Sequence, residues 1–179
     1  YQDVISVSKS LDSIDNKYLN FKSIVLKDEN HYVMPSVTIP KSIKNIYSKY
    51  SDIDKIEYDS IISKLETSPI KYLTDKYDLI KDFYGIVKKI SVNDFMAIEK
   101  YIETNEKYSL YDELAKKSAK YYSETILPSY YKARFLEESG KPEKAMLLYR
   151  SAYNMKEVQG LTKDYLLKLA DQIQSDFNL

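Results

Sequence analysis

Hydrophobic residues recur at the spacing of an α-helix through most of the chain. From residue 53 onward, apolar side chains are separated by three or four positions, which places them on one face of each helix. The clearest stripes are Tyr72, Leu73, Tyr77, Ile80 and Phe83; Phe95, Ile98, Tyr101 and Ile102; and Leu166, Leu169, Ala170, Ile173 and Phe177. The pattern predicts a mainly α-helical domain over residues 53–179, whose helices pack through these faces.

Residues that typically begin and end helices separate these stripes. Ser68 and Thr162 each precede a helical stripe and are predicted to be N-caps, since their hydroxyls accept from backbone N–H groups of the first turn. Ser91 with Asp94 resembles a capping box, with Asp in place of the usual Glu. Gly85 is typical of a helix C-terminus. These signals predict helices joined by short loops.

The first 52 residues show a different pattern. A helix is predicted by the spacing of Val4, Val7, Leu11 and Ile14, and a buried strand by the alternation from Phe21 to Leu26. A polar loop follows, then a second helix with Pro40 expected in its first turn. A lone strand cannot satisfy its own backbone donors and acceptors. We therefore expect residues 1–52 to be an incomplete domain that needs a larger sheet or a second copy of the chain.

Composition narrows the classes of function. The 179 residues carry 27 basic and 27 acidic side chains, so no basic excess is available to neutralise nucleic-acid phosphates. The sequence contains no cysteine, which excludes thiol catalysis, disulfides and thiolate metal sites. No apolar run is long enough to predict a membrane span, and no cofactor-binding motif occurs. The compartment is not decided by these features.

The only histidine lies in the loop after the predicted strand. The run KDENHYVMPSVTIPKSIKNIYSKY, residues 27–50, resembles the end of the α/β-hydrolase domain of bacterial putative esterases related to esterase D and enterochelin esterase. Glu29, Asn30 and His31 match the triplet that follows the last strand in that family. The resemblance implies that His31 is the histidine of a catalytic triad. From the residues alone, an ordinary loop histidine is an equally good interpretation.

The other members of such a triad are not found in the chain. None of the three glycines, Gly85, Gly140 and Gly160, is followed two positions later by serine, so a G-x-S-x-G nucleophile turn is missing. Because the family order is nucleophile, acid, histidine, the resemblance implies that the first two precede residue 1. The chain opens on Tyr1 without a signal-peptide pattern, which we interpret as removal of an upstream segment. We expect this chain alone to have no esterase activity.

The segment YYKARFLEESGKPEKAMLLYRSAYNM, residues 130–155, predicts a helical hairpin. Small residues, a glycine turn and an aromatic residue fall at the positions typical of a tetratricopeptide repeat: Ala133, Gly140, Ala145, Tyr149 and Ala152. The repeat's first-helix tryptophan and closing proline are missing, so the resemblance is to one degenerate repeat. A tetratricopeptide-like helical tail also follows the hydrolase domain in the same putative esterases, and KYLTDKYDLIKDFYGIVKKISVNDF, residues 71–95, resembles the segment before their repeat.

The 19 tyrosines favour tight packing between helices, with a partner-binding surface as the alternative. Two adjacent pairs, Tyr121 with Tyr122 and Tyr130 with Tyr131, are the candidates for a partner groove, because we expect one ring of each pair to lie near solvent. Runs of lysine and pairs of carboxylates in the chain are typical of solvated helix surfaces, and no metal site is predicted.

Two functions are consistent with these observations. In the first, the chain is the C-terminal part of a serine esterase. It would supply His31 to an N-terminal hydrolase domain and carry a helical accessory domain that covers the active-site mouth, binds a protein or mediates dimerisation. In the second, it is an independent helical module for protein–protein interaction. Because a bare strand edge and bare helix faces tend to pair, we also expect residues before Tyr50 to form a homodimer.

Overall fold

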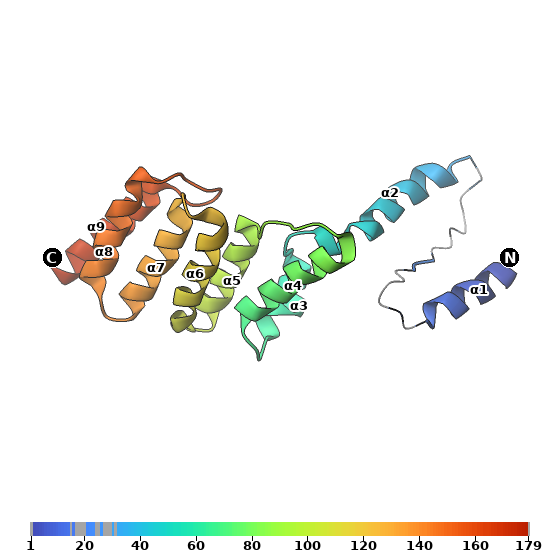
Figure 1. The fold of residues 1–179 in the computed structure, drawn as a ribbon, viewed down its shortest axis with the longest axis horizontal. Helices are drawn as coiled ribbons and strands as arrows, with labels where there is room; N and C mark the ends of the chain where they lie inside the picture. The colour runs from blue at the N-terminus through green and yellow to red at the C-terminus, as the bar shows by residue number, and fades with distance from the viewer. Residues whose placement is uncertain are drawn as a thin grey trace. The chain divides into compact units, whose positions relative to one another are not determined.

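The structure is a computed structural model that describes residues 2–14, 16, 21–23, 26, 30 and 32–178 (Figure 1). The described chain is mainly helical, which confirms the predicted fold class. Its α-helices are α1 (Gln2–Asp12), α2 (Met34–Ile46), α3 (Lys55–Ser60), α4 (Pro69–Tyr84), α5 (Val92–Thr104), α6 (Tyr111–Tyr122), α7 (Ile126–Glu138), α8 (Pro142–Ser151) and α9 (Lys163–Phe177). Short 3-10 helices span Ser48–Tyr50, Ile62–Lys64, Tyr108–Leu110 and Ala152–Asn154.

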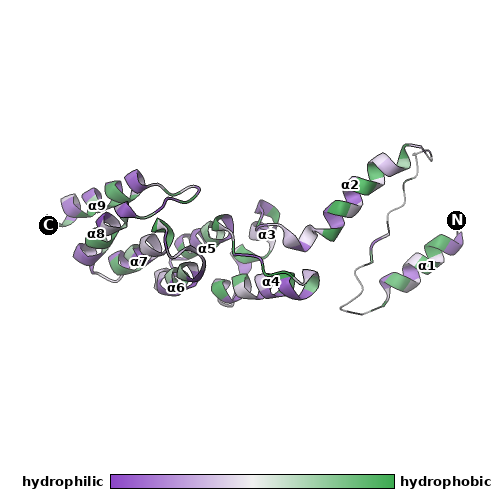
Figure 2. Cartoon of the chain, turned by 45° about the horizontal axis from the view of Figure 1, so that its top comes forward, coloured by the Kyte–Doolittle hydropathy of each residue, from purple (hydrophilic) through white to green (hydrophobic). Residues whose placement is uncertain are grey.

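The chain divides into two compact units, residues 1–51 and residues 52–179. The division lies one residue before the boundary expected from the sequence. We call these the first unit and the second unit. Both α1 and α2 of the first unit carry hydrophobic as well as polar residues (Figure 2), yet none of the described residues of this unit is buried. The second unit contains the hydrophobic core.

The strand predicted from Phe21 to Leu26 is wrong for the residues that the structure describes. Residues 21–23 and 26 have no regular secondary structure, and residues 24 and 25 lie outside the described residues. A strand is held by hydrogen bonds to a neighbouring strand, and in the described part of the chain the only extended pairings are two single bridges of the second unit, Thr125 with Lys156 and Val158 with Leu161. Alternation alone does not supply the missing neighbour.

The second helix of the first unit begins earlier than predicted. α2 starts at Met34, with Pro35 in its first turn and Pro40 inside the helix, so the expected place of Pro40 is wrong. Asn30 explains the earlier start. Its side-chain oxygen accepts hydrogen bonds from the backbone N–H groups of Tyr32 and Val33, both at 3.0 Å. Such a turn favours the helix that follows it, because it satisfies backbone donors near the N-terminus.

In the second unit, helices α6, α7, α8 and α9 follow one another in space as in sequence, each packed against the next (Figure 1). The predicted hairpin is formed by α7 and α8. Its turn is a Schellman motif, in which Lys141 N–H donates to Leu136 C=O and Gly140 N–H donates to Glu137 C=O. Gly140 has a φ of +70°, the left-handed conformation expected for it.

Side chains expected at the close approaches of the hairpin are buried: Ala133, Ala145, Tyr149 and Ala152. Capping at the helix ends also follows the sequence. The hydroxyl of Ser68 accepts from Lys71 N–H, that of Thr162 accepts from Tyr165 N–H, and Gly85 ends α4 with a φ of 69°.

No described helix combines the length and the hydropathy that crossing a bilayer requires.

Candidate functional site

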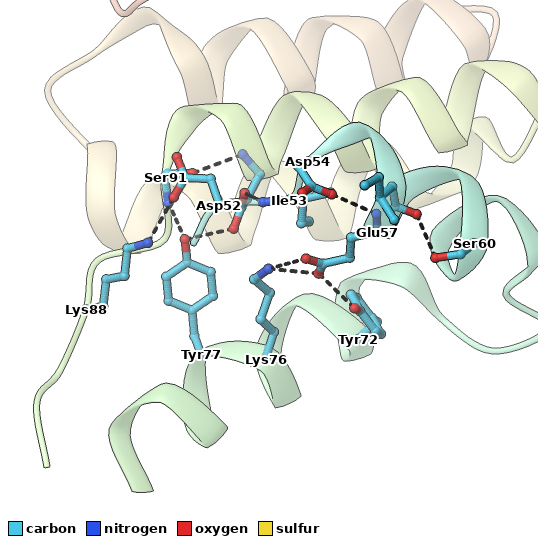
Figure 3. Close-up of polar contacts among 12 residues, drawn as sticks. Asp52, Ile53, Asp54, Glu57, Ser60, Tyr72, Lys76, Tyr77, Lys88 and Ser91 are labelled. Atoms are coloured by element: carbon cyan, nitrogen blue, oxygen red, sulfur yellow. Dashed lines mark hydrogen bonds and ion pairs between the residues drawn. The ribbon is translucent and has the colours of Figure 1, made fainter. Parts of the chain in front are cut away.

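A fully buried carboxylate, Asp94, joins three segments at the start of the second unit. The backbone N–H of Ile53 donates to Asp94 Oδ1 at 2.6 Å, and the hydroxyl of Tyr77 donates to Oδ2 at 2.9 Å. The same hydroxyl accepts from the backbone N–H of Ser91 at 2.8 Å. Figure 3 shows Tyr77 of α4 reaching toward Ser91 and the segment of Ile53. We call Asp94, Tyr77, Ser91 and Ile53 the Asp94 cluster.

The cluster differs from the predicted capping box. Ser91 does cap α5, because its hydroxyl accepts from Asp94 N–H at 3.1 Å. In a capping box the backbone N–H of the N-cap residue donates to the side chain three positions later. Here the N–H of Ser91 donates to the Tyr77 hydroxyl, and the Asp94 carboxylate accepts from Ile53 N–H. The predicted resemblance to a capping box therefore holds for the N-cap and not for the reciprocal bond. The physical reason is tertiary: α4 brings a phenol to the N-terminus of α5.

The electrostatics of the Asp94 cluster indicate a structural role. Burial raises the pKa of Asp94, although the hydrogen bonds from Ile53 and Tyr77 act in the opposite direction, and burial also raises the pKa of Tyr77. Asp52 precedes Ile53, and its Oδ1 lies 2.9 Å from Nζ of Lys88. Burial acts to raise the pKa of Asp52, but the hydrogen bond and charge of Lys88 act more strongly in the opposite direction, so the pKa is lowered. Asp94 is fully buried and accepts from Ile53 and Tyr77, so the cluster fixes three segments of the chain.

A second carboxylate, the half-buried Glu99, lies at a cavity. The cavity has a volume of about 290 Å³ and is formed by α5, α7, the loop before α9 and α9 itself. Its lining side chains are apolar or aromatic except for one carboxylate: Met96, Glu99, Leu127, Tyr130, Gly160, Leu161 and Tyr165. We call it the Glu99 cavity. Concave, mostly apolar sites with few polar groups are the usual form of a binding site.

Two tyrosine hydroxyls hold Glu99 in place. Tyr130 donates to Oε1 at 2.5 Å and Tyr131 donates to Oε2 at 3.4 Å. Burial raises the pKa of Glu99, and the neighbouring charge of Glu103 adds to this effect, while the bond from Tyr130 opposes it. Among the described residues, no lysine or arginine forms an ion pair with Glu99. The carboxylate is thus oriented by neutral donors.

The wall opposite α7 depends on a glycine. Gly160 has a φ of +81°, in the left-handed region that disfavours other residues. A Cβ atom at this position would lie 2.6 Å from Cε of Met96. The loop therefore approaches α5 closely, and Leu161 and Tyr165 follow it into the lining of the cavity.

The structure places the predicted partner-binding tyrosines in different surroundings. Tyr130 and Tyr131 are both buried, with exposed fractions of 6% and 0%, so the expectation of one ring near solvent is wrong for this pair. Tyr130 nevertheless lines the Glu99 cavity. Tyr121 and Tyr122 are half-buried and do not line it. The hydroxyl of Tyr122 donates to Ile90 C=O at 2.8 Å. A common groove for all four is not formed.

His31, the proposed triad histidine, and Glu29 beside it lie outside the described residues. Sequence reasoning also missed the carboxylate and most of the lining of the Glu99 cavity. Glu99 was indistinguishable from a surface glutamate, because nothing in its local pattern indicates the phenols that α7 brings to it. The one available signal was Gly160, a glycine that no helix end required.

Comparison with known proteins shows fold similarity alone. No family model and no curated protein matches the sequence. A crystal structure of an uncharacterised protein from Capnocytophaga ochracea DSM 7271 is similar, with a TM-score of 0.76 and 22% sequence identity. The match covers 98% of this chain and 49% of the other, so this chain spans about half the length of that protein. The chain therefore shares its fold with part of a longer protein that is itself uncharacterised.

Proposed function

We propose that the chain is the C-terminal part of a serine esterase, in which the second unit is a helical binding domain that acts by contact rather than by chemistry. The observation that carries the first half of this proposal is the exposure of the first unit. Val4 and Val7 on α1 and Ile39 and Ile43 on α2 are each more than half exposed. Apolar helix faces of this kind are normally covered by another layer of structure.

An α/β-hydrolase sheet supplies such a layer. In a doubly wound fold, helices pack their apolar faces on a sheet. The resemblance of residues 27–50 to the end of a hydrolase domain favours this occupant over a second copy of the chain. In that setting His31 would act as the general base that activates a serine nucleophile.

The test is hydrolysis of p-nitrophenyl acetate by the protein that the natural gene encodes. We expect turnover that falls about 10³-fold or more in His31→Ala, as for loss of a triad member. The neighbouring Tyr32→Ala is the matched control and is expected to retain turnover. The isolated chain is expected to show none. A gene product without a serine turn upstream, or with activity that survives His31→Ala, would refute the esterase assignment.

An independent interaction module is the second candidate function. It is favoured by the Glu99 cavity, which lies wholly within the second unit. The oligomeric state of the isolated chain bears on both candidates. Bare apolar faces on α1 and α2 predict a dimer in light scattering, and Val7→Lys with Ile43→Lys is expected to restore the monomer. A chain that stays monomeric at high concentration would contradict the prediction that the apolar faces of α1 and α2 drive association.

A further inference from the structure

The Glu99 cavity combines one negative charge with aromatic and aliphatic walls. The carboxylate of Glu99 lies among Met96, Leu127 and Leu161, and the rings of Tyr130 and Tyr165 are 6.3 Å apart between centroids. Tyr165 is half-exposed and forms the outer part of this lining. A charge that is partly buried among apolar side chains is costly unless an opposite charge joins it.

The one cation of the described chain whose charge is shown to act on Glu99 forms its ion pairs with other carboxylates. Arg134 lies on α7, one turn beyond Tyr130, and pairs with Glu103 at 2.7 Å and Glu137 at 3.0 Å. The charge of Arg134 acts on Glu99 from a distance and lowers its pKa, but no ion pair joins them, and the hydrogen bonds that the described residues donate to the carboxylate come from two phenols. A cation from outside the chain would complete the site.

We propose that the Glu99 cavity binds the side chain of a lysine presented by a protein partner. The aliphatic stem of the lysine packs against Met96, Leu127 and Leu161, as lysine stems do along apolar surfaces. The ammonium reaches Glu99 and lies near the tyrosine rings, where cation–π attraction adds to the ion pair. A volume of about 290 Å³ has room for one such side chain.

The geometry favours lysine over arginine. Each oxygen of Glu99 already accepts one hydrogen bond from a tyrosine. Arginine binds a carboxylate best through two parallel bonds to both oxygens, which the two phenols obstruct. An ammonium is a compact charge that needs only one of the remaining lone pairs. This inference rests on the proposed binding role of the second unit and names the chemistry that its partner presents.

The experiment titrates the whole chain with n-butylammonium chloride, which reproduces a lysine side chain. The reporter is the ¹³C methyl resonance of Met96, one of four methionines, assigned with Met96→Leu. We expect a saturable shift at millimolar concentrations. 1-Pentanol, a neutral probe of similar size, is expected to bind at least about tenfold more weakly, because it lacks the charge.

Two pairs of variants isolate the site. Glu99→Gln keeps a hydrogen-bond acceptor for Tyr130 and removes the charge, and a loss of affinity of about tenfold or more is expected. Glu66→Gln, in an exposed loop, is its control. Tyr165→Ala removes an aromatic wall, and Tyr153→Ala is its control, because the two rings are similarly exposed at 45% and 47%. We expect Tyr165→Ala to weaken binding several-fold and both controls to leave it unchanged.

Three results would overturn the inference: no shift at Met96, equal affinity for 1-pentanol, or full affinity in Glu99→Gln. Unchanged methyl resonances of the other three methionines, in the variants without ligand, establish that they fold. The outcome can be separated from that of the esterase proposal. The titration measures binding to the second unit, whereas the His31→Ala variant is tested by its rate of ester hydrolysis.

Discussion

Removing the hydroxyl of the buried Tyr77 should destabilise the second unit. The hydroxyl donates to Asp94 Oδ2 at 2.9 Å and accepts from Ser91 N–H at 2.8 Å. Tyr77→Phe leaves a fully buried carboxylate oxygen and a partly buried N–H without this partner. A lost bond to a buried charged group costs about 2 kcal/mol and an unpaired N–H about 1 kcal/mol. We expect the free energy of unfolding to fall by about 3 kcal/mol.

Urea denaturation of the whole chain, followed by circular dichroism, measures this change, and amide hydrogen exchange locates it. Ile53 N–H should lose protection in Tyr77→Phe, because it donates to the same carboxylate at 2.6 Å. Tyr165→Phe, which removes the hydroxyl of a half-exposed ring, is the control and is expected to change stability by less than about 0.5 kcal/mol. A loss below about 1 kcal/mol in Tyr77→Phe would show that Asp94 does not fix these segments.

Three further changes probe the second unit. Gly160→Ala and Gly140→Ala should each cost about 1–2 kcal/mol in urea denaturation, since both need positive φ, but only Gly160→Ala should shift the methyl resonance of Met96. Thr162→Ala should cost about 1 kcal/mol by loss of an N-cap, and an unchanged midpoint would contradict the cap. Burial raises the pKa of Glu99 in the folded chain above its ordinary value of 4.5, so ionised Glu99 disfavours folding. The free energy of unfolding should therefore fall as pH rises from 4.5 through the raised pKa of the folded state. The variant Glu99→Gln should lack this part of the pH dependence.

The features predicted correctly from the sequence are those fixed within a few residues. An N-cap such as Ser68 or Thr162 acts on an N–H three positions later, so its effect can be read from local order. Gly140 and Gly85 end helices by a conformation that their own backbone permits. The helical stripes likewise follow from a period of 3.6 residues. Local chemistry sets these elements before any packing is known.

The features that the sequence did not reveal depend on residues far apart in the chain. Asp94 looked like half of a capping box, and only the approach of Tyr77, 17 positions earlier, redirects its carboxylate. Tyr130 and Tyr131 looked like a pair with one solvent-facing ring. Both are buried, and both hydroxyls donate to Glu99 on α5. Neighbouring tyrosines do not have to divide between core and solvent when one carboxylate accepts from both hydroxyls.

The two units show that the same pattern has different consequences. Phe95 and Ile98 on α5 are fully buried, whereas Val7 on α1 and Ile43 on α2, at equally regular spacing, remain more than half exposed. Periodicity identifies which face of a helix is apolar, but it does not identify the structure that covers that face. Covering an exposed valine or isoleucine is worth on the order of 1 kcal/mol for each side chain. Several such residues on two helices would therefore contribute free energy to packing against any structure that covers them.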